Sequence, residues 1–571
     1  MTYVVPSSPT AIADATWDDL APYFEALATT PLDVQTVEEW LGNWSRLTAV
    51  IDEAGTLAMI AYTCDTADPS KESANLRWSS EIFPRVGEQH VRLAERLVAL
   101  GWTRDDMVVV LRQFRTDIEI FREENVALFS ALEAHVAAYQ KVTGGLDAEW
   151  EGERLTIPQL QPFLKERDRA VRERAFRLGA DAYLAHHDEL SAMFDAMFAL
   201  RQRIATNAGF ANYMEYAFRA KYRFDYTPDD CARFHAAVEA TATPAVERLM
   251  AHRREALGEP SVRPWDTLVQ LESERPVRPF HDLDGFVAPA RRIFDALDPE
   301  LGTQFRSMAS DGLLDLESRP GKAPGGYCTK LPWRGQPFIF MNAVGVPDDV
   351  NTLMHEAGHS FHDFAAHPQP FIWQRGTGHE AAELASMSME LFVTPFLSQP
   401  IGYYSPGDAR AVEIEQLEDV LSSLVHIASV DAFQRWIYTS GEGHIAAARD
   451  AMWLQLRERF ERGVDWSDLA NERVSRWLRQ LHIFELPFYY IEYGIAQLGA
   501  LQLWRDAQRD PQGTMQRYKS ALALGGTCTL PDIYAAAGAR LIFDTDGMRE
   551  LVDMVEARLQ LLRGSGTASG L

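Results

Sequence analysis

Cysteine is scarce in this chain of 571 residues, which has four, and none of them forms a Cys-x-x-Cys pair. The sequence therefore predicts no disulfide framework. The start of the chain has no basic residues followed by a long apolar run. No window approaches the roughly 20 apolar residues that would cross a bilayer. We therefore expect a cytoplasmic protein of a reducing compartment, with no signal peptide and no membrane partner. The cysteines are Cys64, Cys231, Cys328 and Cys528.

Basic charge is also in deficit, because 55 Lys and Arg stand against 82 Asp and Glu, a net charge of -27. An acidic surface repels phosphate backbones, so we expect no nucleic-acid partner. The chain has no Gly-x-Gly-x-x-Gly motif, no regular strand–helix alternation and no repeat of fixed period. Its length exceeds that of most single domains, which favours more than one lobe.

Helical periodicity dominates the rest of the sequence. The stretches Glu88–Leu100 and Glu124–Tyr139 place apolar residues every three or four positions among charged ones, as amphipathic helices do. These patterns predict a mainly α fold. Comparable apolar stripes recur at 158–222, 410–437, 446–462 and 548–563.

Two short segments predict strands between the helices. Asp147–Ile157 alternates around a central Glu-Gly, which predicts a hairpin, and Pro158 then suits the first turn of a helix. The second segment is Pro337–Asn342, preceded by the Gly- and Pro-rich stretch 319–328, which we expect to be irregular. A helix should follow from about Asp348.

The chemical motifs all lie in the second part of the chain. We therefore predict a helical N-terminal lobe at 1–205 and a catalytic lobe at 206–562. Residues 563–571 are rich in Gly and Ser and are expected to form a disordered tail.

The segment His355-Glu-Ala-Gly-His359 carries the clearest chemistry. Residues at i and i+4 share one face of a helix, so both imidazoles can reach one ion. Zinc takes nitrogen ligands and keeps an open position for water in catalytic sites. The intervening Glu356 is placed to accept the proton of that water. The segment predicts one catalytic zinc ion per chain, with Glu356 as the general base.

A third protein ligand is needed, because catalytic zinc sites usually have three. The segment from His379 is expected to form a second helix, with Glu380, Glu383 and Glu390 on one broad face. A carboxylate among Met, Leu and Phe costs several kcal/mol unless it is paired or metal-bound. By geometry alone, both Glu380 and Glu383 fit the third position. His362, at i+7 from His355, is expected beside the site as a partner of the ligands, with an ordinary buried histidine as the alternative.

These motifs resemble those of the oligoendopeptidase F and thimet oligopeptidase family of zinc peptidases. That family has His-Glu-x-x-His on one helix and Glu-x-x-Ser-x-x-x-Glu on the next. Glu383, Ser386 and Glu390 match the second pattern. The resemblance implies that Glu383 is the third ligand. Glu390 is then expected to hold a ligand histidine through its second ring nitrogen.

The resemblance extends to a segment that runs from His482 to Tyr493. In the family, a histidine and a Tyr-x-x-Tyr pair face the reacting carbonyl of the substrate. His482, Tyr490 and Tyr493 match them, with Tyr489 as a neighbouring substrate contact. Which tyrosine serves the oxyanion stays open. The Gly-rich run of the thimet-type members is missing here, so the chain is closer to the bacterial oligoendopeptidase F branch. The resemblance covers roughly residues 140–545.

The predicted function is zinc-dependent hydrolysis of internal bonds in short unfolded peptides. The β segment at Phe338 and the loop Gly325-Gly326-Tyr327 are expected to pair with an extended substrate as an added strand. The resemblance implies a two-lobed, mainly α body that encloses a deep channel, with a small β element beside the His-Glu-x-x-His helix.

Other interpretations fit part of the pattern. Helical zinc carboxypeptidases of the Taq type also pair His-Glu-x-x-His with a downstream Glu-x-x-Ser helix, and would remove single C-terminal residues. A non-catalytic peptide-binding protein with a vestigial metal site, or a helical scaffold without metal, would need no turnover. The oligomeric state stays open.

Overall fold

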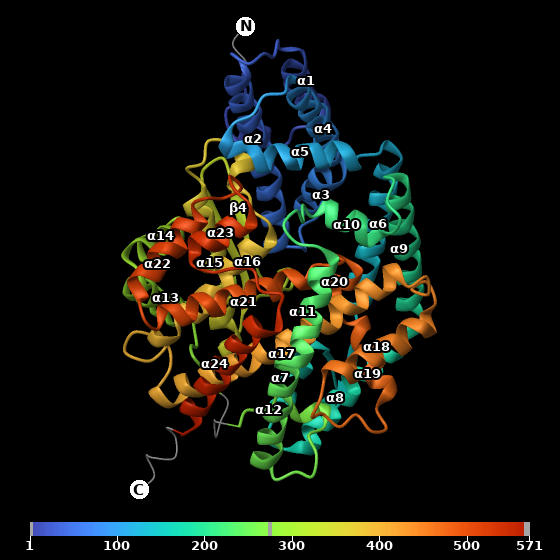
Figure 1. Ribbon diagram of the computed structural model, residues 1–571, viewed down its shortest axis with the longest axis vertical. Coiled ribbons are helices and arrows are strands. Elements are labelled where there is room, and N and C mark those ends of the chain that lie inside the picture. The colour runs from blue at the N-terminus through green and yellow to red at the C-terminus, as the bar shows by residue number, and fades with distance from the viewer. Residues whose placement is uncertain (1–3, 272–276, 565–571) are drawn as a thin grey trace. The chain divides into compact units, whose positions relative to one another are not determined.

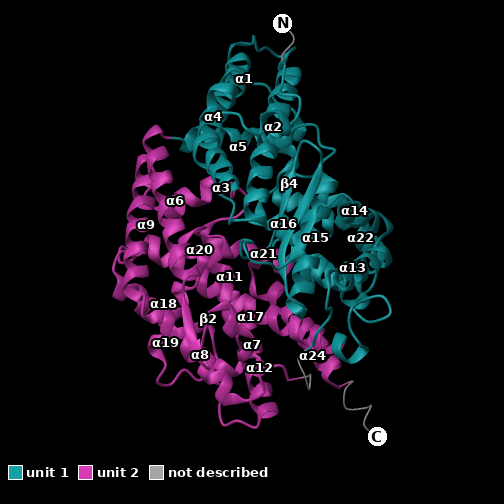
Figure 2. Ribbon diagram, turned by 180° about the vertical axis from the view of Figure 1, so that it is seen from behind, with its two compact units in different colours: residues 1–121, 277–409, 499–541 teal, residues 122–276, 410–498, 542–571 magenta. Residues whose placement is uncertain are grey.

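The computed structural model describes residues 4–271 and 277–564, and helices dominate it, as expected (Figure 1). The chain divides into two compact units, each assembled from three separate stretches (Figure 2). Unit 1 comprises residues 1–121, 277–409 and 499–541, and unit 2 comprises residues 122–276, 410–498 and 542–571.

This division differs from the expected boundary near residue 205. That residue lies inside α9 (His187–Asn207), where Ile204 and Ala205 are fully buried, so the chain does not leave unit 2 there. The first two residues of the expected tail, 563 and 564, are helical. Helix α24 (Thr545–Gly564) continues through Gly564, and residues 565–571 lie outside the described part of the chain.

Unit 1 contains an N-terminal helical layer and the His-Glu-x-x-His helix with its sheet. The large apolar side chains of the N-terminal helices form one buried cluster, in which Trp40, Trp44 and Phe114 are almost fully covered. The helices of unit 1 are α1 (Trp17–Thr29), α2 (Val37–Cys64), α3 (Pro69–Leu76), α4 (Phe83–Leu100), α5 (Val108–Ile120), α13 (Leu283–Leu297), α14 (Pro299–Ser310), α15 (Pro347–Ala366), α16 (His379–Phe392), α22 (Pro511–Leu522) and α23 (Leu530–Ala537).

The sheet of unit 1 has three strands in the order β3-β5-β4. The predicted β segment is the central strand β5 (Gln336–Ala343), which pairs in parallel with β3 (Leu314–Glu317) and antiparallel with β4 (Tyr327–Leu331). The irregular stretch predicted at 319–328 therefore ends in a strand. Helix α15 packs against β5 and β4, so the sheet supports this helix directly.

Unit 2 is also helical, and the predicted hairpin is present in it. Strands β1 (Asp147–Trp150) and β2 (Glu153–Thr156) pair antiparallel, and Pro158 begins a short 3-10 helix. The helices of unit 2 are α6 (Glu123–Gly144), α7 (Gln161–Leu164), α8 (Arg169–Leu184), α9, α10 (Tyr213–Ala220), α11 (Pro228–Ala240), α12 (Ala242–Leu257), α18 (Ala446–Phe460), α19 (Ala470–Leu478), α20 (Leu481–Phe484) and α24, together with most of α17 (Pro406–Thr439) and the first half of α21 (Tyr490–Ala507).

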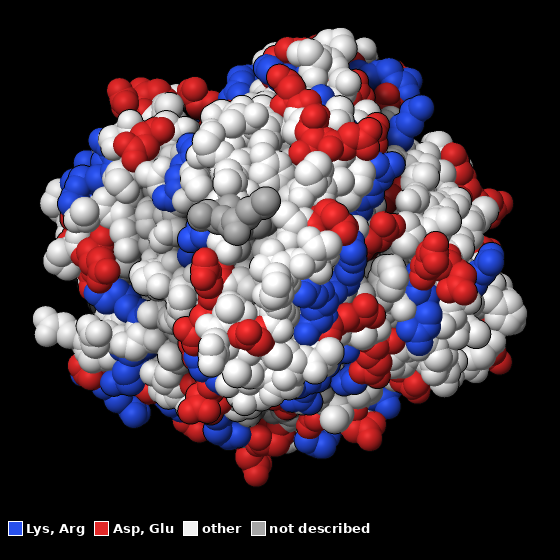
Figure 3. All heavy atoms as spheres, turned by 90° about the horizontal axis from the view of Figure 1, so that it is seen from above, with Lys and Arg blue, Asp and Glu red and all other residues white. Residues whose placement is uncertain are grey.

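Charged side chains are mixed on the face that Figure 3 shows, where acidic and basic groups alternate without a large basic patch. That face therefore shows no basic surface of the kind that binds nucleic acid.

Helix α2 requires one correction to the sequence analysis. By length and composition alone it could cross a membrane, with a window of mean hydropathy 1.2. The expectation that no window approaches this limit was wrong. The first half of α2 lies in the core of unit 1, where Leu41, Leu47 and Val50 are fully buried, and core helices of folded proteins pass the same test.

A buried carboxylate fixes α2 against the turn that follows β4. Glu53 of α2 is fully buried and accepts hydrogen bonds from the backbone N–H groups of Trp333 and Arg334, at 2.8 and 3.0 Å. The Arg334 side chain adds an ion pair at 2.7 Å. A buried charge is tolerated only when it is paired and hydrogen-bonded in this way.

We expect Glu53→Ala to lower the free energy of unfolding by about 3 kcal/mol, because it leaves two backbone donors and a guanidinium without their acceptor. Chemical denaturation followed by circular dichroism measures this change. Glu95→Ala, at an exposed position of α4, should change stability by less than about 0.5 kcal/mol. Equal effects of the two substitutions would contradict the role given to Glu53.

Candidate active site

Helix α15 begins at Pro347, next to Asp348, where the sequence predicts the start of the helix that carries His355 and His359. Pro347 occupies its first turn, and the carboxylate of Asp349 accepts hydrogen bonds from the backbone N–H groups of Val344, Gly345 and Val346 at 2.8–2.9 Å. This cap fixes the start of the helix and therefore the rotation of the residues that follow. The buried apolar residues of α15 include Val350, Leu353, Met354, Ala357 and Phe361.

Helices α15 and α16 approach each other closely at Gly358. A Cβ atom on Gly358 would lie 2.6 Å from the Cα of Ser386 and 2.7 Å from the carbonyl oxygen of Ala385. Only glycine fits here, since those distances are shorter than any real contact. The close approach brings the carboxylate side chains of α16 up to the imidazoles of α15.

Two tyrosines of unit 1 hold α16 by hydrogen bonds to its backbone carbonyls. The hydroxyl of Tyr518 in α22 donates to the carbonyl of Ala385 at 2.9 Å, and the hydroxyl of Tyr534 in α23 donates to the carbonyl of Glu380 at 3.0 Å. Both tyrosines are fully buried. These contacts fix the position of α16 relative to α22 and α23.

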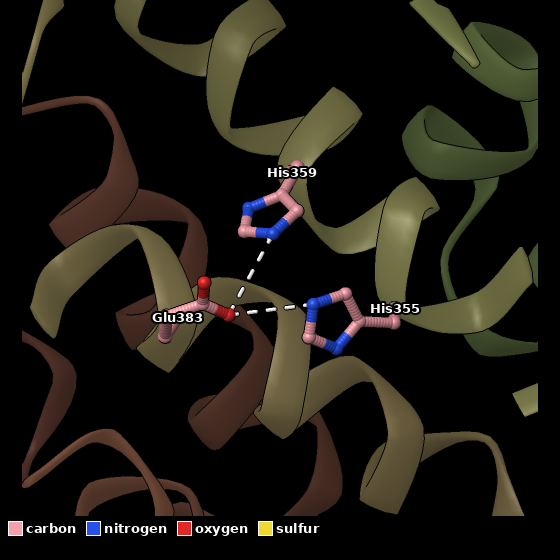
Figure 4. A group of neighbouring side chains, drawn as sticks. All are labelled: His355, His359 and Glu383. Carbon is pink, nitrogen blue, oxygen red and sulfur yellow. Dashed lines mark ion pairs between the residues drawn. The ribbon is translucent and has the colours of Figure 1, made fainter. Parts of the chain in front are cut away.

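His355, His359 and Glu383 come together in one cluster, in which one ligand atom from each lies within 4.8 Å of the others. Both Nε2 atoms point toward Oε2 of Glu383, at 3.3 Å from His355 and 3.7 Å from His359 (Figure 4). Ligands about 2.0–2.2 Å from a tetrahedral zinc ion lie about 3.3–3.6 Å from one another. The three side chains therefore fit a metal of this kind.

Hydrogen bonds from outside the cluster hold two of its three members, His355 and Glu383. Nδ1 of His355 lies 2.6 Å from Oε1 of Glu390, and an ionised carboxylate can only accept, so Nδ1 carries the proton. The amide of Asn351 donates to the other oxygen of Glu390 at 3.0 Å. The hydroxyl of Ser386 donates to Oε2 of Glu383 at 2.9 Å. The predicted contact between Glu390 and a ligand histidine is thus present.

Burial and mutual charge set the protonation of the cluster. Burial opposes a charge on His355, but hydrogen bonds to Glu383 and Glu390 raise the pKa of this imidazole well above its usual value. Burial lowers the pKa of His359 to about 4. Burial acts to raise the pKa of Glu383, yet His355 and His359 hold it at about 2. One proton on His355 thus offsets part of the carboxylate charge.

Glu356 lies beside this cluster and faces the edge of the sheet. Its side chain is buried, and burial raises its pKa to about 7. The backbone N–H of Cys328, in β4, donates to its carboxylate. The carboxylate is therefore held at the edge strand with a pKa suited to accepting a proton near neutral pH.

The free edge of the sheet belongs to β4, not to β5. Lys330 is paired with Pro337, which has no N–H, so this pair cannot exchange two hydrogen bonds. The N–H and C=O groups of Lys330 and of Cys328 therefore point away from β5. Phe338 lies in β5, which is paired on both sides and buried, so it cannot add a substrate strand as predicted. Strand order could not be derived from the sequence.

The predicted Gly-Gly-Tyr loop leads into this edge strand. Gly325 has φ of 94°, a left-handed conformation that glycine adopts without strain. The carbonyl of Gly325 accepts a hydrogen bond from the amide of Asn342 at 2.9 Å. Gly326 adjoins Phe340, and Tyr327 is the first residue of β4, with its ring stacked on that of Phe340 at 4.8 Å. These residues thus form the entry to the free edge.

Two further candidates lie outside the three-residue cluster. Oε2 of Glu380 lies near Gly378, whose Cβ would be only 2.6 Å from it, so this side chain turns back to the start of α16. His362 is buried, and its burial lowers its pKa to about 3. Among the described residues, the cluster that fits a metal contains Glu383 and neither of these two.

The predicted carbonyl-facing residues lie together in unit 2. The ring of His482 lies 5.1 Å from that of Tyr490 and 6.1 Å from that of Tyr493, and Tyr489 lies 5.0 Å from Tyr493. The hydroxyl of Tyr490 donates to Gln480 at 2.9 Å, and burial raises its pKa to about 12. That hydroxyl is thus engaged within unit 2. The roles predicted for these residues stay predictions.

The sequence analysis missed several supporting residues. Asn351 donates to Glu390, and the backbone of Cys328 donates to Glu356. Tyr518 and Tyr534, which lie far along the chain from α16, hold that helix. Asn351 lies one helical turn before His355, a spacing that signals a shared face. No sequence signal marks the tyrosines or the backbone contact.

Comparisons with known proteins identify the family of this chain. The profile of peptidase family M3 matches residues 163–553, and that of the peptidase M3 N-terminal domain matches residues 9–104. The oligoendopeptidase F homolog of Borreliella burgdorferi is 20% identical over 79% of this chain and 76% of its own length. The chromosomal oligoendopeptidase F of Lactococcus lactis subsp. cremoris is 22% identical over 48% of this chain and 45% of its own length.

Solved structures give the same result for the fold. The structure of Pz peptidase A with an inhibitor superposes with a TM-score of 0.89 at 25% identity, covering 95% of this chain and 97% of that one. A 3.1 Å structure named as an oligoendopeptidase F gives a TM-score of 0.85 at 26% identity, with 98% of both chains covered.

Two neighbouring helices that bring two imidazoles and a carboxylate together could hold a metal ion, as metallopeptidases do. The chain belongs to peptidase family M3. It is therefore an enzyme of the metalloendopeptidase class, and the mainly α fold expected from the sequence is confirmed.

We expect Gly358→Ala to separate α15 from α16, because the added methyl group meets the backbone of α16. Stability should fall by about 2 kcal/mol or more, and the content of bound metal should fall with it. Gly87→Ala in α4 adds a methyl group to open space and should stabilise its helix by up to about 1 kcal/mol. Unchanged metal content in Gly358→Ala would show that the close approach is not needed.

Proposed function

We propose that this chain is a zinc-dependent endopeptidase that hydrolyses internal bonds of short peptides. His355, His359 and Glu383 would hold one zinc ion, and Glu356 would act as the general base. One observation carries the proposal: the three ligand atoms lie within 4.8 Å of one another on two neighbouring helices, next to the buried carboxylate.

Zinc bound there would lower the pKa of a water molecule toward ~7 and polarise the peptide carbonyl. The residues of the chain divide the remaining work. Glu390 keeps the proton of His355 on Nδ1, which leaves Nε2 free to bind. Glu356 takes a proton from the attacking water and later delivers it to the leaving amine. Ser386 fixes the carboxylate of Glu383.

The free edge of β4 would hold the substrate as an added antiparallel strand. The outward C=O of Cys328 and the outward N–H and C=O of Lys330 offer main-chain hydrogen bonds that do not depend on side chains, whereas the N–H of Cys328 donates to Glu356. This edge adjoins Glu356 through the N–H of Cys328, so a paired peptide would pass the general base. The resemblance adds His482 and Tyr493 as donors to the developing oxyanion.

An endopeptidase is favoured over a carboxypeptidase of the Taq type. The curated relatives are named oligoendopeptidase F, and the residues match that family in both the Glu-x-x-Ser-x-x-x-Glu helix and the segment from His482 to Tyr493. An open strand edge also accepts a chain that continues in both directions.

We expect Glu356→Gln to lower kcat on an internally quenched peptide by about 10²–10⁴-fold, since the amide cannot accept the proton. Zinc content, measured by elemental analysis, should stay near one per chain, because Glu356 is not a ligand. Glu383→Gln should lose zinc, whereas Glu380→Gln should keep both zinc and turnover. Unchanged turnover in Glu356→Gln would overturn the assigned base.

We expect the enzyme to cleave short peptides that are blocked at both ends, because the added strand needs no free terminus. Mass spectrometry of the products, with and without a chelator, locates the cut bonds and tests the need for metal. Release of single C-terminal residues from unblocked peptides, with no cut in blocked ones, would instead support the carboxypeptidase.

A further inference from the structure

One stripe of α2 faces the sheet beside the candidate active site. Ser45, Asp52 and Thr63 are spaced by 7 and 11 residues, which places them within about 20° of one another around the helix. Ser45 accepts a hydrogen bond from the backbone N–H of Ile372 at 2.8 Å, and the hydroxyls of Thr63 and Tyr327 lie 2.7 Å apart. Asp52 thus faces the region between these two contacts, within unit 1.

This stripe lies on the face of β4 opposite to α15. Cys328 and Lys330 contact α15, at Ser360 and Asp363, so the alternate residue Tyr327 points to the other face, where Thr63 meets it. The sheet edge that Glu356 adjoins is therefore flanked by α15 on one face and by the stripe of α2 that contains Asp52 on the other.

Asp52 is a carboxylate without a counter-charge. Within the described ranges, its side chain has no hydrogen bond and no ion pair. Burial raises its pKa to about 7, and no charged neighbour contributes to the shift. Its oxygens are nevertheless not sealed from solvent. Asp52 is thus a largely desolvated acid whose oxygens meet solvent and for which the described fold supplies no partner.

We propose that Asp52 selects peptides by a cationic group, either a Lys or Arg side chain or the free N-terminal ammonium. An ammonium or guanidinium group that enters this region would complete a charge-assisted hydrogen bond in a partly dry setting, where such bonds are strong. The inference rests on the proposed function, because it assigns a specificity residue for the same reaction.

The position of this group along the peptide follows from helix and strand geometry. Asp52 lies about 16 Å along α2 from Thr63, which corresponds to about five strand residues beyond Tyr327. The next helix residue, Glu53, contacts the backbone of Trp333 and Arg334, which agrees with that estimate. A peptide antiparallel to β4 would therefore present its cationic group about three to five residues before the cleaved bond.

The experiment uses internally quenched peptides that share one sequence except on the N-terminal side of the cleaved bond. One set carries Lys or its neutral isostere norleucine, with the N-terminus blocked. The other carries a free or an acetylated N-terminus three to five residues before the cut. For the wild type we expect kcat/KM to be at least about tenfold higher with the cationic member of one set.

Asp52→Asn should remove this preference and leave kcat/KM for the neutral peptides within about twofold. Glu39→Gln, which removes an exposed charge from the same helix, should keep the preference. Asp52→Lys should instead favour a peptide with Glu at the preferred position, a charge exchange that a folding defect would not produce. The set that responds identifies the source of the cation.

The outcomes separate this inference from the proposed function. Equal preferences in the wild type and in Asp52→Asn, with neutral peptides still cut, would overturn the role of Asp52 alone. No preference for either cationic set in the wild type would do the same. Failure of the wild type to cut any of the peptides, with zinc present, would overturn the proposed endopeptidase.

Discussion

The contact between α15 and α16 at Gly358 is the constraint on which the site depends. Because this residue has no Cβ, the backbone of α16 lies against the helix that carries His355 and His359. The distance between helices sets the distance between ligands, since a short glutamate side chain cannot cover a wider gap. Tyr518 and Tyr534 hold α16 in place by hydrogen bonds to its backbone carbonyls.

Charge explains why this contact favours a cation. Three buried or half-buried carboxylates, those of Glu356, Glu383 and Glu390, surround two imidazoles. A proton on His355 offsets only one negative charge, and it sits where a metal ligand must be deprotonated. A divalent ion held by His355, His359 and Glu383 would take the place of that proton and supply one more positive charge. Without an ion the cluster would lower the free energy of unfolding, because buried carboxylates that lack counter-charges destabilise a fold.

The residues that sequence could predict are those whose geometry is local. His355 and His359 share a face by helical spacing, and the cap at Asp349 lies within the same segment. Long-range pairing could not be derived in this way. Phe338 was a reasonable candidate for substrate pairing until β5 proved to lie between two partners. The boundary near residue 205 failed for the same reason, because each unit gathers three distant stretches of chain.

Two kinds of contact along β4, one from its main chain and one from the stripe of α2, would suit the proposed peptide substrates. Main-chain hydrogen bonds along an edge strand attach any extended sequence, so they confer affinity without selectivity. Selectivity must then come from side chains that flank the edge. On the face of β4 opposite to α15, the stripe of α2 supplies Asp52, an ionisable group without a partner in the described fold. A general peptidase can in this way acquire a preference through one residue that leaves the reacting groups untouched.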